Sequence, residues 1–149
     1  MNMVNRYGLP TEATVNRLIW HKNGPWKRTE ITRYTVPHNF PTQHGDFLEQ
    51  TINYRVPVHL IDELTQFDGS VYIDSTAGEL SAKCHKEPMN ILSLNLVHDI
   101  VIGKKTVDEA RMFYAKTAQE FQQSQKSPYT EQLLFPKQRL TNDPGISYF

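Results

Sequence analysis

An intramolecular disulfide bond is impossible, because the 149-residue chain contains a single cysteine, Cys84. A protein with so little cysteine is typical of a reducing compartment. The sequence also lacks an apolar run of the roughly 18 residues that a membrane-spanning helix requires. Its first residues lack the apolar stretch of a signal peptide. These absences predict a soluble, cytoplasmic protein without contact to a membrane.

Charge of either sign is not in excess either, because 16 lysines and arginines balance 16 aspartates and glutamates. A net charge of zero gives no general attraction to nucleic acid or to anionic lipid. The sequence contains no glycine-rich phosphate loop, no GxSxG and no CxxC. We therefore expect no nucleotide cofactor and no covalent hydrolase mechanism, and the sequence predicts no cofactor of any kind.

The length predicts one domain over residues 1–149, since a chain of this size buries roughly two thirds of its unfolded surface. Residues 1–12 contain Gly8 and Pro10 and are expected to be irregular. Residues 124–149 are expected to form an extended tail, in which apolar islands alternate with prolines and polar residues. Such a tail needs a docking surface, on the same subunit or on a second one.

Strands are indicated by alternating or continuous runs of apolar and β-branched residues. These runs are residues 18–22, 26–32, 47–58, 71–75 and 79–84. Asn23-Gly24 lies between the first two, and this dipeptide favours the two-residue turn of a tight hairpin. Phe47–Val58 alternates most clearly, with Gln50 as the one polar residue on its apolar side. The order predicts two hairpins and one long strand.

Helices are predicted over residues 60–67, 88–102 and 106–123. Thr106 and Glu109 form a capping box that starts the last of them. The helix over 88–102 is apolar almost all round, so it is either the centre of the fold or part of a dimer interface. The fold class is α+β, with an antiparallel sheet of about four to five strands and two or three helices mainly on one face.

The segment Pro37–Asp46, with Glu49 just beyond it, is the best candidate for a chemical site. His38, His44 and Asp46 are possible metal ligands, and Glu49 is the possible catalytic base of a metal-dependent enzyme. Their spacing matches no zincin or thiolate signature. The alternative is a structural connection in which the histidines bind backbone groups and Phe40 packs into the core.

Cys84 and His85 form a second pair that could serve a nucleophile. Adjacent strand residues point to opposite faces, so we expect no contact between them and a buried, structural Cys84. His98 and Asp99 are either an acid–base pair or a hydrogen-bonded polar strip. The residues expected at an interface or binding surface are Trp26, Arg28, Phe40, Asn95, His98, Asp99 and Phe135.

A third possibility is nucleic-acid binding by the hairpin Trp20–Tyr34, which mixes aromatic and basic side chains. It predicts a strongly salt-dependent affinity. The neutral net charge and the absence of a known RNA-binding strand motif argue against it. We therefore expect no nucleic-acid partner.

Several motifs resemble a family of uncharacterised cyanobacterial-type proteins. They are Asn23-Gly24-Pro25-Trp26-Lys27-Arg28, Pro37-His38-Asn39-Phe40-Pro41, Leu48-Glu49-Gln50, Tyr54-Arg55-Val56-Pro57, Gly103-Lys104-Lys105-Thr106-Val107 and Pro128-Tyr129-Thr130-Glu131. The resemblance covers most of the chain and implies a bacterial, cytosolic setting. It implies no activity and no site residue.

The sequence thus favours a small non-catalytic interaction or ligand-binding protein that forms a homodimer. Its partner is a second copy, or an unidentified small molecule or protein. The alternatives are the metal-dependent enzyme of the 38–49 segment and the nucleic-acid-binding hairpin.

Overall fold

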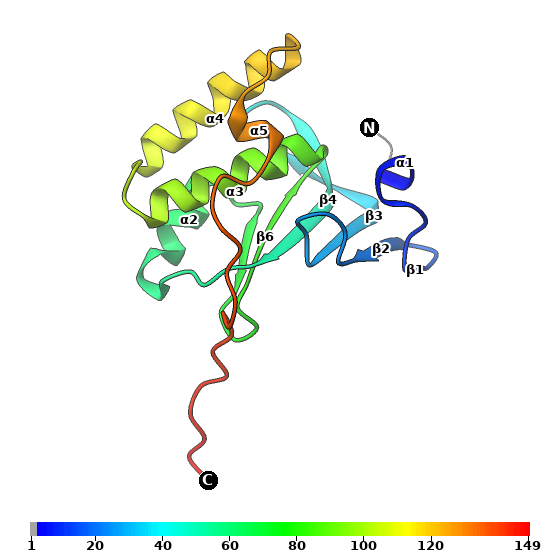
Figure 1. Cartoon of the computed structure of the whole chain (residues 1–149). Helices are drawn as coiled ribbons and strands as arrows, with labels where there is room; N and C mark the ends of the chain where they lie inside the picture. The colour runs from blue at the N-terminus through cyan, green and yellow to red at the C-terminus, as the bar shows by residue number, and fades with distance from the viewer. Residues whose placement is uncertain (1–2) are drawn as a thin grey trace.

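The computed structural model describes residues 3–149, in which one antiparallel sheet carries helices on one face (Figure 1). The strands of this sheet are β1 (Glu12–Ala13), β2 (Arg17–His21), β3 (Arg28–His38), β4 (His44–Asn53), β5 (Val71–Asp74) and β6 (Glu79–Cys84). They lie in the order β1-β2-β3-β4-β6-β5. The α+β class and the antiparallel sheet are confirmed, with one strand more than expected.

The extra strand corrects the expectation that residues 1–12 are irregular. Helix α1 (Met3–Tyr7) and strand β1 both fall in or at the end of this stretch, while residues 1 and 2 lie outside the described part. Met3 is buried in a small cluster with Trp20 and Leu48. Tertiary contacts of this kind stabilise elements too short for sequence periodicity to indicate.

The first hairpin is confirmed, but its predicted two-residue turn is wrong. The connection from β2 to β3 runs over residues 22–27 and is closed by a 2.8 Å hydrogen bond from the Lys22 amide to the Lys27 carbonyl. Burial of Trp26 explains the longer turn, because its indole reaches inward to donate to Glu87 at 2.7 Å. Asn23 is also buried and donates to Thr29 at 2.9 Å.

Strand β4 starts at His44 and ends at Asn53, earlier at both ends than the predicted 47–58. It starts earlier because His44 pairs with His38 of β3, so the two strands continue to the tip of their hairpin. Gln50 is fully buried on the apolar side, where its amide donates to Thr29 at 3.2 Å and its carbonyl accepts from Asn90 at 3.0 Å. Those bonds explain how a polar side chain is tolerated there.

Three helices follow the predicted positions: α2 (Ile61–Phe67), α3 (Glu87–Val101) and α4 (Val107–Gln122). Two short helices do not, because η1 (Val58–Leu60) begins within the predicted strand 47–58 and α5 (Pro128–Glu131) lies in the tail that was expected to be extended. Among the described residues, no helix has the length and apolar character needed to cross a membrane. The capping box is present at α4, because the Thr106 hydroxyl accepts from the Glu109 amide and the Glu109 carboxylate accepts from the Thr106 amide.

Helix α3 is the centre of the fold. It lies between the sheet and α4, and the side chains of Leu92, Leu94 and Leu96 have no exposed surface in the single chain (Figure 1). The apolar surface that the sequence left open between core and dimer interface is therefore covered by the protein itself.

The tail, residues 124–149, is only partly extended, because it contains α5. Asn95 on α3 holds it by donating to the carbonyls of Tyr129 and Gln132 and accepting from the amide of Leu134. Farther along, the hydroxyl of the buried Thr141 donates to the Gly78 carbonyl at 2.7 Å. The tail thus docks on its own subunit before its end projects away from the sheet (Figure 1).

Candidate metal centre

The candidate site lies where the β3–β4 hairpin meets the end of β6. Cys84, the last residue of β6, pairs with Leu48 of β4. Because side chains alternate along a strand, Cys84 faces the same side of the sheet as His44 and Asp46. His85 follows directly after β6, so the alternation of the strand no longer governs its direction.

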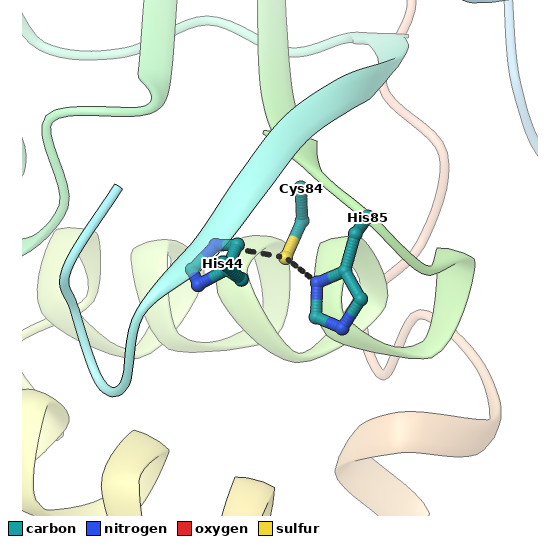
Figure 2. A group of neighbouring side chains, drawn as sticks. All are labelled: His44, Cys84 and His85. Atoms are coloured by element: carbon teal, nitrogen blue, oxygen red, sulfur yellow. Dashed lines mark hydrogen bonds between the residues drawn. The ribbon is translucent and has the colours of Figure 1, made fainter. Parts of the chain in front are cut away.

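Three donor atoms converge there. The Sγ atom of Cys84 lies 3.6 Å from Nε2 of His44 and 3.4 Å from Nδ1 of His85. Figure 2 shows Cys84 between the two imidazole rings. All three atoms lie within 4.8 Å of one another. The expectation that Cys84 and His85 do not touch is therefore wrong.

These separations match those of ligands around one small cation. Bond lengths of about 2.3 Å for Zn–S and about 2.0–2.1 Å for Zn–N place S and N about 3.5 Å apart at the tetrahedral angle. The observed 3.4 and 3.6 Å lie within about 0.1 Å of that value. Both sulfur–nitrogen separations therefore suit a shared ion.

The hydrogen bonds of His44 favour a metal-binding ring nitrogen. Its Nδ1 atom lies 2.7 Å from the carbonyl oxygen of Thr42, which can only accept, so Nδ1 carries a proton. In the neutral ring, Nε2 then presents a lone pair toward Cys84. A backbone carbonyl that fixes the tautomer is the usual support of a histidine ligand.

Asp46 places an unpartnered carboxylate oxygen beside this ring. The side chain is 1% exposed, and Oδ1 has no hydrogen-bond donor among the described residues. It lies 3.0 Å from Nε2 of His44 without the geometry of a hydrogen bond. A buried, unpaired carboxylate is costly, and a nearby cation would offset that cost.

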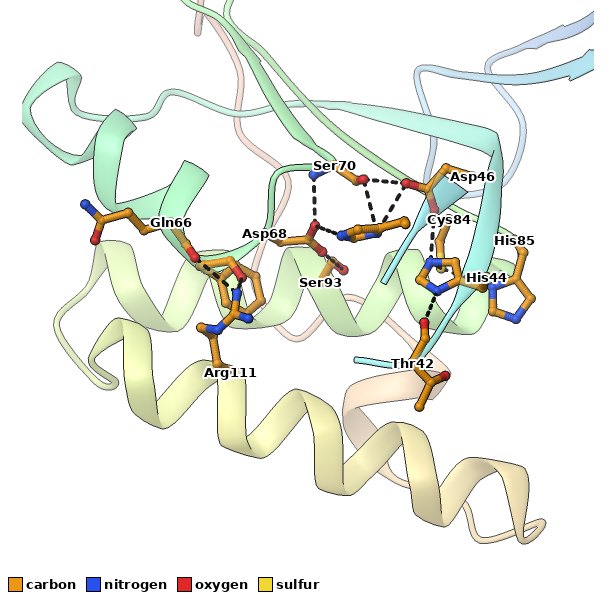
Figure 3. Close-up of polar contacts among 12 residues, drawn as sticks. Thr42, His44, Asp46, Gln66, Asp68, Ser70, Cys84, His85, Ser93 and Arg111 are labelled. Atoms are coloured by element: carbon orange, nitrogen blue, oxygen red, sulfur yellow. Dashed lines mark hydrogen bonds and ion pairs between the residues drawn. The ribbon is translucent and has the colours of Figure 1, made fainter. Parts of the chain in front are cut away.

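The other oxygen of Asp46 belongs to a polar network (Figure 3). It accepts from the Ser70 hydroxyl and lies 3.3 Å from Nδ1 of His38. The second ring nitrogen of His38 lies 3.7 Å from Asp68, whose pKa is raised by burial. His38, His44 and Asp46 also form a second group of three possible ligands, which shares His44 with the first.

Burial shifts the pKa values of Cys84 and His85. It raises the pKa of the Cys84 thiol to about 11, so the group is a thiol rather than a free thiolate at neutral pH. Burial also lowers the pKa of His85, and the neighbouring His44 adds to this effect. A neutral imidazole is the form that binds a metal, whereas the thiol must first release its proton.

Glu49, the predicted catalytic base, does not lie beside the predicted ligands His44 and Asp46. It lies an odd number of positions from His44 and Asp46 on β4, and so faces the other side of the sheet. Burial and the carboxylate of Glu30 raise its pKa. The structure therefore gives no support to Glu49 as the base for a centre at His44.

Two of the residues expected at an interface or binding surface, Arg28 and Phe40, make contacts within the chain. Arg28 forms two hydrogen bonds with Glu79, at 3.0 and 2.6 Å. Phe40 packs on Tyr114 with 5.3 Å between ring centroids, and Arg111 lies 3.9 Å above it. The structural interpretation of Phe40 thus holds.

The polar residues His98 and Asp99 of α3 contact residues of the same subunit, including residues of the tail. Nδ1 of His98 lies 2.7 Å from the Tyr54 hydroxyl, and its ring stacks on Phe135 at 4.6 Å. Asp99 accepts from Lys105 and Tyr129, each at 2.7 Å. His98 and Asp99 therefore have separate partners.

The proposed nucleic-acid surface lacks exposed tryptophans. Trp20 and Trp26 are each 2% exposed, so neither presents a ring on which a base can stack.

Comparisons with protein-family models, curated proteins and solved structures gave no match, so the resemblance to cyanobacterial-type proteins stays a prediction.

Proposed function

We propose that this protein binds a divalent transition-metal ion of the zinc class through His44, Cys84 and His85, and that it does so without catalysis. The observation that carries the proposal is that the Cys84 sulfur lies at separations typical of tetrahedral ligands from one ring nitrogen of His44 and one of His85. A thiolate with two imidazoles is a soft to borderline donor set that suits zinc better than calcium or magnesium.

The space beside the ligands supports a non-catalytic role. The cavity bordered by His44, Cys84 and His85 measures about 30 Å³. Enzyme and ligand sites commonly measure about 300–1,000 Å³, so this cavity is at least about tenfold smaller than a typical substrate site. Glu49, the base of the enzyme alternative, faces the other side of the sheet.

Native mass spectrometry of the full chain, purified without chelator and then titrated with zinc, tests the proposal. We expect one zinc per subunit and the release of one proton from Cys84 at neutral pH. Cobalt in place of zinc should give the visible absorption of a tetrahedral thiolate complex. Absence of stoichiometric metal at micromolar zinc would contradict the proposal.

Variants identify the ligands. His85→Ala and Cys84→Ser should each abolish stoichiometric binding, whereas His59→Ala removes an exposed histidine outside both ligand groups and should leave it unchanged. Equal zinc content in His85→Ala and the parent would exclude His85. The same spectra report the subunit count and thereby test the predicted homodimer.

A further inference from the structure

A separate cavity of about 510 Å³ lies between the turn 22–27, the end of β4 and the tail. Its volume falls within the range typical of small-molecule sites. Its lining includes the apolar side chains of Pro25, Trp26, Ile52, Leu133 and Phe135. Trp26 and Phe135, which the sequence predicts at an interface or binding surface, both contribute to this lining.

The cavity is lined by cations without a matching acidic residue. Lys22, Lys27, Lys137 and Arg139 contribute to its lining, and no aspartate or glutamate does. Lys27 is paired with Glu79 at 2.7 Å. Within residues 3–149, the other three form no ion pair.

The wall formed by the tail is held in place. Gln138, which lines the cavity, accepts a 2.8 Å hydrogen bond from the amide of Arg55. Leu134 on one side and Thr141 on the other are hydrogen-bonded to Asn95 and Gly78. A fixed wall means that a ligand finds the cavity already formed.

We propose that this cavity binds an amphipathic anion, a medium-chain alkyl carboxylate. The apolar lining would cover the alkyl chain, mainly through Leu133 and Phe135, because Trp26 and Ile52 are almost completely buried. Lys22, Lys137 and Arg139 would contact the carboxylate. The combination is selective, because an apolar cavity alone would accept a neutral chain equally well. The inference rests on a different part of the molecule from the metal centre and does not depend on it.

Isothermal titration of the full chain with octanoate, decanoate and dodecanoate, each below its micelle concentration, tests the apolar part. We expect saturable binding and an affinity that rises about fourfold per added methylene while the chain still fits. No saturable binding of dodecanoate at millimolar concentration would overturn the proposal.

The contribution of the cationic side chains is tested with ligands of different charge and with a variant that lacks two of these cations. Dodecanol and dodecyltrimethylammonium should bind at least about fivefold more weakly than dodecanoate. The double variant Lys137→Gln/Arg139→Gln should lose about fivefold in dodecanoate affinity and little in dodecanol affinity. Both positions are exposed, so we expect an unchanged fold, checked by circular dichroism.

The matched control is Lys116→Gln/Lys126→Gln, which removes two exposed lysines outside the cavity lining. It should bind dodecanoate like the parent. Equal losses in the two double variants would mean that net charge alone acts, and equal binding of dodecanol and dodecanoate would mean that the cavity recognises only an apolar chain. Either result would overturn the proposal.

Discussion

Replacing Asp46 by asparagine should stabilise the metal-free protein, although Asp46 is almost completely buried. Its Oδ1 atom has no donor among the described residues and lies near the lone pair of His44 Nε2. An asparagine amide could donate to that nitrogen while its carbonyl keeps the bond from Ser70. The substitution thus removes a buried charge and adds a hydrogen bond.

The expected gain follows from the cost of an unsatisfied buried group, about 1–3 kcal/mol. Taking about 2 kcal/mol for the metal-free protein, the unfolding temperature should rise by about 4–8 °C for a chain of this length. The measurement is thermal unfolding followed by circular dichroism in the presence of a chelator.

Zinc should remove this advantage. At a free zinc concentration 100 times its Kd, the parent gains about 2.7 kcal/mol from binding. Loss of the carboxylate beside the ion should weaken binding about 10–100-fold. The variant would then gain only about 0.4–1.4 kcal/mol, and the two unfolding temperatures should nearly coincide.

Glu49→Gln is the control, because it removes the same charge from the same strand on the opposite face. Zinc should raise its unfolding temperature as much as that of the parent. A metal-free Asp46→Asn protein less stable than the parent, or one with the full zinc response, would refute the reasoning.

Asn95→Ala should cost about 2–4 kcal/mol, because it removes three hydrogen bonds to the tail, and limited proteolysis should then cut the tail first. Hydrogen bonding to Arg28 lowers the pKa of Glu79 from 4.5 to about 2. The pair should therefore stabilise the protein fully above about pH 4.5 and lose about 1–3 kcal/mol as the pH falls toward 2, a loss that acid titration should find absent in Glu79→Gln. Gly78→Ala should lower the unfolding temperature strongly, because Gly78 has φ +69° and a Cβ there would lie 2.2 Å from the tail backbone, whereas Gly69→Ala meets no atom within 4 Å and should have a small effect.

Local patterns in the sequence were enough to predict most helices and strands of the fold. The capping box of Thr106 and Glu109 fixes where α4 begins, because both partners lie within one turn. Alternation along residues 48–52 likewise gives the buried face of β4. The prediction of a two-residue turn at Asn23-Gly24 was wrong because Trp26 is buried and hydrogen-bonded to Glu87, which is distant in the sequence. No local pattern indicates that contact.

The sequence predicted only part of the candidate metal centre, namely His44 and its neighbours on the β3–β4 hairpin. His38, His44 and Asp46 come together because a short hairpin connects them. The even spacing of His38, His44 and Asp46 differs from the odd spacing to Glu49. Strand alternation alone could therefore have excluded Glu49 from this site. Cys84 and His85 reach His44 only through the pairing of β4 with β6, and strand order is not determined by local composition.

The two proposed sites differ in when they can form during synthesis. All three ligands of the metal centre lie between residues 44 and 85, and thus emerge in the first part of the chain. The anion cavity requires Lys137 and Arg139 opposite a turn at residues 22–27. Chains grow from the N-terminus at about 5–20 residues per second, so the cavity closes last. A nascent chain could thus carry a metal ion before it has any place for an alkyl anion.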